Sequence, residues 1–493
     1  LKWRHLEEAR RYAATVGHRM SWEELVERYA PPQDIRQHIH DWLSDCGIAV
    51  VEADPAVISA TGTFKNVQNA FNMAFQAQMG FGHRYYMPIA DPSVPEWMAP
   101  YVESIVGMEN ISKLERYHRI PFEMDNLAHD GKGFYPDDIA KAYNFPVGLK
   151  GKNVTIGILE FTNGYNIHDL NAFWDRFSLP RPHVEFVSVD GEPNSGGINF
   201  WDLEATLDLE WAGAMAPGAK LVVYEASGGT SDKSFALSVL RALTRAIRDK
   251  KHHPDILSFS YGNAESRVPT ATIRAWDAII AQGALMGIPT LVASGDTGAY
   301  GLRGPGHKRP HVDAPAACPH AVAVGGTSLV LDRNKKRFSE KGWANIHNNG
   351  ASGGGISQAF DVPEYQQYIA LPLKKDMKPG RGVPDVALNA DPETGYAVYF
   401  QGQEGVVGGT SVSAPVWAAI IALLFEQRAN NGKHRMALLH NALYSLKDSE
   451  AFYQIVENHN DYGDVEGYQC APGWNAVTGL GVPDVARLLG ELS

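Results

Sequence analysis

The chain has 493 residues, of which 44% are hydrophobic, and this length suggests more than one folded domain. Its net charge of −12 at pH 7 argues against a nucleic-acid partner. The three cysteines, at positions 46, 318 and 470, are too few for a disulfide framework, and no apolar run is as long as a membrane-spanning helix, so we expect no membrane segment.

The pattern of the first 118 residues predicts a small unit of helices and strands. Ser21 and Glu24 have the spacing of a capping box, which opens a helix. Further short periodic segments follow, separated by turn residues. The polar segment 116–133 has no periodicity and is predicted to be a linker. The elements expected before it are helices over 21–29, 35–46 and 67–75, strands over 48–52 and 56–60, and a hairpin around 79–83.

From residue 134 onward, apolar strands alternate with helices. Near-continuous apolar strands separated by helices are typical of a parallel sheet that is covered on both faces. We therefore expect a doubly wound α/β domain. The expected strands are 154–159, 221–224, 256–259 and 289–293, and the expected helices are 201–214, 231–249, 271–286 and the apolar stretch that follows Pro415.

The segment Gly408–Pro415 contains Gly409-Thr410-Ser411 and runs into the apolar residues 416–425. A small-residue turn before an apolar helix places Ser411 at a helix N-terminus, where unpaired N–H groups favour negative charge. A serine nucleophile needs this setting, because its attack on a carbonyl creates an oxyanion. The alternative is a helix-capping cluster of Ser and Thr. An esterase of the Gly-x-Ser-x-Gly type is disfavoured, because the second glycine is absent.

A serine on such a sheet suggests the subtilisin architecture, but the usual histidine base is not found. None of the 18 histidines is followed by glycine, and the expected position of the triad aspartate holds Glu160. Glu204 and Asp208 lie four residues apart, on one face of a predicted helix without basic residues. Asp296 follows an apolar strand, at the edge where open sheets bind ligands. The alternatives are a solvated acidic face for the pair and an ordinary turn residue for Asp296.

Taken together, these residues resemble the sedolisins, the serine-carboxyl peptidases, and within them the kumamolisin-like zymogens. The resemblance covers nearly the whole chain, and residues 20–110 look like the prodomain of that family. The motifs that carry it are Tyr135-Pro136, Ala142-Tyr143-Asn144-Phe145-Pro146, Asp208-Leu209-Glu210, Gly325-Gly326-Thr327, Arg381-Gly382-Val383-Pro384-Asp385-Val386-Ala387, Gly409-Thr410-Ser411, and Gly473-Trp474 with Thr478-Gly479-Leu480-Gly481.

The resemblance implies a role for each of four residues. Ser411 would be the nucleophile, and Glu204 the general base that takes its proton. Asp208 would hold Glu204, as the triad aspartate holds histidine. Asp296 would lie by the oxyanion, and it must be protonated to donate a hydrogen bond there. Carboxylates in place of histidine imply activity at acid pH.

The resemblance also implies a supporting pair behind these residues. Glu160 matches an acid that bonds to the base in kumamolisin-like members. Tyr261 stands where that family usually carries a tryptophan that extends the network. Because a tyrosine can still donate through its hydroxyl, we expect an altered pH dependence rather than loss of function.

A domain organisation and a function follow from the same resemblance. We expect a subtilisin-like, mostly parallel sheet with an N-terminal prodomain of antiparallel sheet and helices. Residues 1–118 would be an inhibitory prodomain, 119–133 a linker with the activation cleavage, and 134–493 the catalytic domain. The expected function is an acid-acting serine endopeptidase that cleaves polypeptides and is secreted by means of a signal peptide outside this chain. The alternatives are a tripeptidyl-peptidase and a catalytically idle binding module.

The family's calcium site is altered in this sequence. Its two aspartate ligands are replaced by Gln454 and Asn475, while the expected backbone ligands are Ile455, Ala471 and Gly473. Calcium affinity falls as charged oxygen ligands are lost. We therefore expect weak or no calcium binding and no required cofactor.

Overall fold

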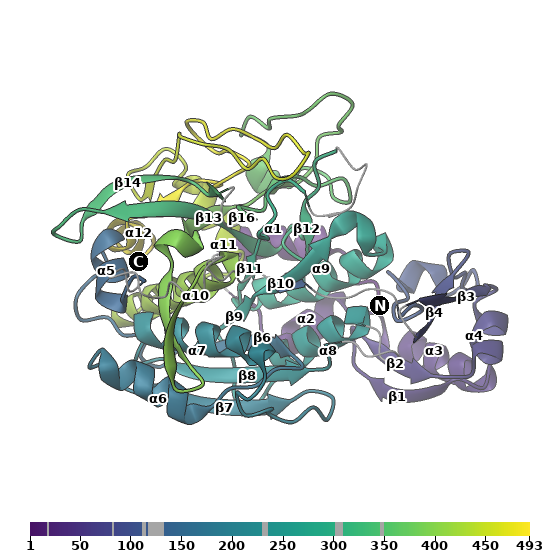
Figure 1. The fold of residues 1–493 in the computed structure, drawn as a ribbon. Coiled ribbons are helices and arrows are strands. Elements are labelled where there is room, and N and C mark those ends of the chain that lie inside the picture. Colours follow the sequence, from purple (N-terminus) through teal and green to yellow (C-terminus); the bar gives the residue numbers. More distant parts are fainter. Residues whose placement is uncertain are drawn as a thin grey trace.

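The computed structural model describes residues 1–16, 19–80, 83–110, 115–116, 133–228, 235–300, 309–345 and 350–493. The chain folds into a large α/β body and a smaller N-terminal unit that lies beside it (Figure 1). The postulated linker over 119–133 lies almost wholly outside the described residues, as does any cleavage position within it.

An eight-stranded, mostly parallel sheet forms the centre of the large body. Its strand order is β14-β13-β11-β9-β6-β8-β7, and β19 pairs with β13; all pairs are parallel except β13 with β14. This confirms the predicted doubly wound sheet. The strands are β6 (Thr155–Phe161), β7 (His183–Ser188), β8 (Lys220–Ala226), β9 (Ile256–Phe259), β11 (Thr290–Ala293), β13 (Ala321–Leu331), β14 (Arg337–Gly342) and β19 (Val386–Asn389).

Helices cover both faces of this sheet, as near-continuous apolar strands require. On one face, α7 (Leu203–Met215) and α10 (Thr410–Asn430) share a core with the sheet. On the other, α8 (Phe235–Ile247) and α9 (Thr270–Leu285) form a second core. The remaining helices of the body are α5 (Pro136–Ala142), α6 (Ile167–Arg176), α11 (Leu439–Ser445) and α12 (Val485–Leu492).

Short antiparallel pairs decorate the loops of the large body. One three-stranded group, in the order β12-β10-β5, includes a strand from the N-terminal side of the linker. The strands are β5 (Glu115–Arg116), β10 (Tyr261–Ala264), β12 (Asp313–Ala314), β15 (Ala344–Asn345) with β16 (Gly350–Ala351), β17 (Gly355–Ile356) with β18 (Gly382–Val383), β20 (Tyr396–Phe400) with β21 (Gln403–Val407), and β22 (Phe452–Tyr453) with β23 (Val482–Pro483).

The N-terminal unit combines four helices with two antiparallel hairpins, which confirms its predicted class. The capping box of Ser21 and Glu24 is present. Its elements are α1 (Leu6–Val16), α2 (Trp22–Tyr29), α3 (Gln33–Asp45), α4 (Phe64–Ala70), the pair β1 (Ala49–Ala53) with β2 (Ile58–Thr61), and the pair β3 (Phe75–Gly80) with β4 (His83–Pro88).

The helix expected over 67–75 is misplaced. It begins at Phe64, because the Thr63 side chain caps Asn66, and it ends at Ala70. Phe75 instead begins β3, and its ring packs edge-on against Phe64. The apolar spacing indicated the existence of the helix but not its bounds.

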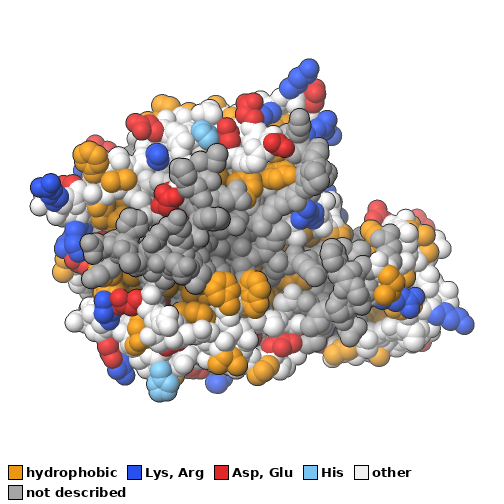
Figure 2. All heavy atoms as spheres, viewed as in Figure 1, with side chains coloured by type: hydrophobic (Ala, Val, Ile, Leu, Met, Phe, Trp, Pro, Cys, Tyr) orange, Lys and Arg blue, Asp and Glu red, His pale blue; other side chains and the backbone are white. Residues whose placement is uncertain are grey.

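The N-terminal unit shares its core with the large body. Buried residues of α1 and α2, such as Ala13 and Leu25, belong to the same cluster as α8 and α9. The unit's own core is smaller and lies around α3 and α4. In Figure 1, α1 and α2 lie against the large body, while α3, α4 and the hairpins project away from it. On the face shown in Figure 2, acidic and basic side chains are interspersed.

Helix α10 differs from the sequence prediction in two respects. It begins at Thr410 rather than after Pro415, so that Pro415 lies inside its first turns. Its 21 residues are also long and apolar enough to cross a membrane, contrary to the prediction that no apolar run reaches that length. The apolar part is 94% buried within the fold, which is typical of a core helix in a globular domain.

Candidate active site

Ser411 lies in the first turn of α10 and is fully buried. The residue before the helix, Gly409, has φ of 112°, a conformation that side-chain-bearing residues rarely adopt. A Cβ on Gly408 would collide with the backbone nitrogen of Pro392. The small residues of the motif therefore permit the tight turn that places Ser411 at the helix N-terminus. Its Oγ donates a hydrogen bond to the carbonyl of Ser260 at 3.3 Å.

Glu204 and Asp208, two of the three carboxyls of α7, are buried in the core. Glu204 and Asp208 both have no exposed surface, as have most of the residues of this helix. The alternative of a solvated acidic face is therefore wrong. Burial, followed by the charges of Glu160 and Glu204, raises the pKa of Asp208 well above its usual value.

Ser260 connects Asp208 of α7 to Ser411. Its hydroxyl donates to both Asp208 oxygens, at 3.1 and 2.9 Å, and approaches the carbonyl oxygen of Ser411 at 3.3 Å. Ser260 lies between β9 and β10, in a position that the sequence analysis did not single out. The contacts place Asp208 on the α7 side and Ser411 on the α10 side of one serine residue.

Asp296 follows β11 and is also fully buried. Its Oδ1 accepts hydrogen bonds from the backbone N–H and the hydroxyl of Thr410, each at 2.9 Å. Asp296 thus contacts the residue immediately before Ser411. The turn allows no side chain at Gly353, where a Cβ would collide with the carbonyl oxygen of Ser294. Asp296 thus fixes the residue that precedes Ser411 through two hydrogen bonds.

Glu160 and Tyr261 are in contact, as the resemblance implied. The Tyr261 hydroxyl donates to Glu160 Oε2. Asn163, which the sequence analysis missed, donates its amide to the same oxygen at 3.0 Å and also contacts the Tyr261 hydroxyl. Tyr261 and Asn163 thus both donate to Glu160 Oε2.

Glu225 is a further buried residue near Glu160, and the sequence analysis missed this carboxyl as well. It has no exposed surface, lies at the end of β8, and accepts a hydrogen bond from the backbone N–H of Asn163 at 2.8 Å. Its signal in the sequence is a single acid within the apolar run Leu221–Ala226. In a strand that is buried on both faces, such an acid requires a partner or a proton.

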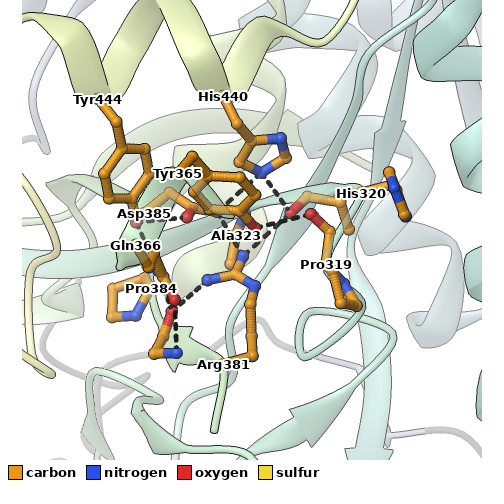
Figure 3. Close-up of polar contacts among 12 residues, drawn as sticks. Pro319, His320, Ala323, Tyr365, Gln366, Arg381, Pro384, Asp385, His440 and Tyr444 are labelled. Atoms are coloured by element: carbon orange, nitrogen blue, oxygen red, sulfur yellow. Dashed lines mark hydrogen bonds and ion pairs between the residues drawn. The ribbon is translucent and has the colours of Figure 1, made fainter. Parts of the chain in front are cut away.

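A buried ion pair ties the start of β13 to the turn before β19 (Figure 3). Arg381 Nη2 lies 2.6 Å from Asp385 Oδ2, and neither side chain is exposed. Tyr444 donates to the other oxygen at 2.8 Å, and the backbone N–H of Ala323 donates to Oδ2 at 2.7 Å. The close-up also shows His440 directed at this carboxylate, at 3.4 Å.

This ion pair remains charged in acid. Burial alone would raise the pKa of Asp385, but Arg381 and His440 outweigh it and lower the pKa to about 2. A lowered pKa in the folded state stabilises the protein above the unfolded-state pKa of about 4, and this contribution is lost only as the pH falls through about 2. The contribution of this one ion pair to stability is therefore retained in moderately acidic medium.

The altered calcium position does not fit the ion. The Asn475 amide nitrogen donates to the carbonyls of Ile455 and Ala471, both at 3.2 Å. Its oxygen accepts from Val477 and Thr478, which fixes the orientation of the amide. An N–H donor thus faces two carbonyls that would have to bind the cation. Among the described residues, no group of three or more acidic, histidine or cysteine side chains is arranged to hold a metal.

We predict that calcium contributes little to stability. Because binding to the native state stabilises by mass action, EDTA should change the melting temperature by less than about 2 °C. Scanning calorimetry with EDTA, and again with excess calcium, measures this. A large fall that calcium reverses would show that other oxygens rebuild the site.

The mostly parallel, helix-covered sheet with a serine at the start of α10 defines a fold of the subtilisin-like hydrolase class. Comparison with known proteins gives the same class. Residues 193–466 match the subtilase family, and residues 4–111 match the pro-kumamolisin activation domain.

The chain belongs to the sedolisin family of serine-carboxyl peptidases, with its prodomain attached. It is 36% identical to kumamolisin of Bacillus sp. (strain MN-32) over 88% of this chain and 79% of that protein. It is 31% identical to the tripeptidyl-peptidase sed1 of Aspergillus fumigatus, over 97% of this chain and 87% of that one. The solved structure of Pseudomonas sedolisin with pseudo-iodotyrostatin superposes with a TM-score of 0.64, at 25% identity, over 73% of this chain and 97% of that chain.

Proposed function

We propose that this protein is an acid-acting endopeptidase that cleaves polypeptides through an acyl-enzyme on Ser411. The observation that carries the proposal is the complete burial of three carboxyls, Glu204, Asp208 and Asp296, on the elements that meet at Ser411. Burying several acids close together is costly, and such arrangements cluster at functional sites.

In the proposed mechanism, Glu204 is the ionised base and takes the proton of Ser411 Oγ as the oxygen attacks the peptide carbonyl. The tetrahedral intermediate collapses with transfer of that proton to the leaving amine. A water molecule, activated by the same carboxylate, then hydrolyses the acyl-enzyme. Asp208 orients Glu204, and Ser260 fixes Asp208 through its hydroxyl.

Asp296 supplies the proposed oxyanion contact. Thr410 occupies Oδ1 with two donors, so a proton on this carboxyl belongs on Oδ2. The protonated oxygen can donate to the developing oxyanion, which an ionised carboxylate cannot do. This requirement, together with the raised pKa of Asp208, supports activity at acid pH.

The alternative activities can be separated by their products. A tripeptidyl-peptidase releases three residues at a time from a free N-terminus, whereas an endopeptidase also cuts a chain whose ends are blocked. We expect cleavage of an end-blocked, internally quenched peptide, with a maximum at the acid end of the range from about pH 3 to pH 7. Mass spectrometry of the products identifies the bonds. Tripeptides as the sole products would establish the exopeptidase, and no turnover at any pH would favour an idle binding module.

The N-terminal unit is, in this proposal, an intramolecular inhibitor. The strand β5, which shortly precedes the linker, pairs antiparallel with β10 and places Arg116 opposite Tyr261. An added strand is how extended peptides commonly bind to an exposed sheet edge. The chain therefore passes beside the Glu160–Tyr261 contact just before the linker. Cleavage after residue 118, within 119–133, would free the catalytic domain.

Charge pairs join this unit to the large body and can respond to acid. Asp54 Oδ2 lies 3.4 Å from Arg248 Nε, and both side chains are largely buried. The Arg248 guanidinium also lies 3.4 Å above the Trp22 ring. Burial lowers the pKa of Arg248 to about 10, which leaves it charged in acid, so protonation of Asp54 would remove its counter-charge. The pair of Glu23 with Lys250, which joins the same two parts, is exposed.

We predict that acid releases the prodomain by way of Asp54. Acidified wild type should yield a fragment that begins within 119–133, while Ser411→Ala should stay whole. Asp54→Asn mimics the protonated acid and should shorten the processing half-time about threefold to tenfold. Gel electrophoresis and N-terminal sequencing measure both.

Glu23→Gln is the matched control for this prediction, because it removes an exposed pair across the same interface. It should change the half-time little. Wild type that remains intact yet is fully active in acid would contradict the inhibitory role. We also propose that the enzyme acts outside the cell, on polypeptides rather than on nucleic acid or membranes; detection of the protein in the culture medium of its source organism tests this.

A further inference from the structure

Two buried carboxyls lie side by side at the carboxyl end of the sheet. In the parallel pair of β6 and β8, Glu160 is the register partner of Glu225. Both side chains point to the face that α7 covers, because Ile158 and Val223, two residues earlier on each strand, belong to the core on that face. Neither glutamate has exposed surface. Like charges on neighbouring strands repel, so a proton must be held at this pair.

Glu225 also holds the loop that supports Glu160. Its Oε1 accepts from the backbone N–H of Asn163, whose side chain donates to Glu160. The residue before Asn163, Thr162, has φ of 54°, which is rare for a β-branched side chain. Such a conformation persists only where neighbouring contacts enforce it. The bond to Glu225 and the bond from the Thr162 N–H to the Ala226 carbonyl, at 2.9 Å, do so here.

The electrostatic surroundings of Glu225 favour its neutral form. Burial, followed by the charge of Glu160, raises its pKa to about 9, and the charge of Glu192 adds to this, while the backbone N–H groups of Asn163 and Thr162 oppose it. Beyond Glu160 lie the Tyr261 hydroxyl and Asp208, whose pKa Glu160 raises in turn. Glu160 thus lies between Glu225 and Asp208, and its charge raises the pKa of both carboxyls.

We propose that Glu225 is a positioning residue of the active site: it carries a proton beside Glu160 and holds the 162–163 loop so that Asn163 and Tyr261 both donate to Glu160. The proposal rests on the function proposed above, because Glu160 matters to the reaction only through the α7 carboxyls. Glu225 itself touches neither Ser411 nor the substrate in this role.

The first test measures the proton and needs no activity. Both proteins carry Ser411→Ala, which prevents self-cleavage. The melting temperature of this parent and that of the parent with Glu225→Gln are measured from about pH 5 to pH 8. A carboxyl whose pKa is raised on folding stabilises fully below its unfolded pKa, and that stability is lost as the pH rises toward about 9. Glutamine keeps the acceptor for Asn163 but cannot ionise.

We expect the melting temperature of Glu225→Gln to rise relative to its parent as the pH increases, by several degrees over this range. The matched control is Glu364→Gln, which removes one carboxylate from the exposed surface and should give a constant difference. A constant difference for Glu225→Gln as well would overturn the proposal, since Glu225 would then carry no extra proton in the folded state.

The second test measures positioning in the active enzyme. Glu225→Leu leaves the Asn163 N–H without its acceptor and should lower kcat at least about tenfold, with KM changed less than about twofold. Glu225→Gln should restore kcat to within about threefold of wild type at acid pH. Equal kcat values for the Glu225→Leu variant and the wild-type enzyme would overturn the positioning role. If wild type itself shows no turnover that depends on Ser411, the proposed function fails, and the melting measurement still decides the protonation of Glu225.

Discussion

Replacement of either Ser411 or Glu204 by alanine is expected to abolish peptide hydrolysis, with kcat lowered by about 10⁴-fold to 10⁶-fold. The two residues act as nucleophile and base in one proton transfer, so the double variant should be little worse than either single variant. Steady-state and single-turnover assays at acid pH measure this. The pattern would distinguish a catalytic unit from two residues that contribute separately to folding.

The matched control is Glu210→Gln on the same helix. Glu210 is also fully buried, burial raises its pKa well above the usual value, and its carboxyl accepts from the Tyr399 N–H at 3.1 Å. It should keep most activity, because it does not contact Ser260 or Ser411 in the network described above. If one histidine of the 134–493 region proves essential while Glu204→Ala retains activity, the carboxylate mechanism is wrong.

Replacement of Asp296 is expected to have the next largest effect, because loss of one oxyanion donor costs about 10²-fold to 10³-fold in kcat. Asp296→Ala removes both the donor and the acceptor of Thr410. Asp296→Asn keeps an oxygen for the two Thr410 donors and a nitrogen that donates at every pH. The Asn variant should therefore retain more activity than the Ala variant, and its activity should decline less as the pH rises.

The measurement is kcat and KM across the acid-to-neutral range for both variants and wild type. The Asn variant can donate at every pH, whereas the wild-type carboxyl can donate only while it holds a proton, so the activity of the variant relative to wild type should increase with pH. Equal losses in both variants, with pH profiles that match wild type, would assign Asp296 to the support of Thr410 rather than to the oxyanion.

Some of the strands and helices could be predicted from the sequence, because they depend on the local pattern of apolar residues. The strand Ile256–Phe259 was predicted with its observed bounds, because an apolar run this short favours a strand over a helix. The bounds of α4 and the start of α10 were missed. They depend on the Thr63 cap and on the tolerance of Pro415 within the first turns, neither of which changes the apolar period.

Helix α1 escaped prediction for a different reason. Its buried residues include Ala9 and Ala13, whose small side chains give little periodic signal. They are buried because α9 of the other domain packs over them. The residues that cover α1 lie far along the chain, so the sequence of the helix alone does not reveal what it packs against.

The sequence by itself determined the family and the order of its motifs, because motifs depend on residue type and spacing along the chain. Through that resemblance it also predicted Ser411, Glu204, Asp208 and Asp296 as the site residues, and the variants described above test their roles. Only the tertiary structure decided that the α7 acids are buried and that Glu225 lies beside Glu160. It also decided that the Asn475 amide donates to the backbone carbonyls of the predicted calcium position. Burial and strand register join residues that lie far apart in the sequence, and the pKa of a carboxyl depends on those neighbours rather than on its own position in a motif.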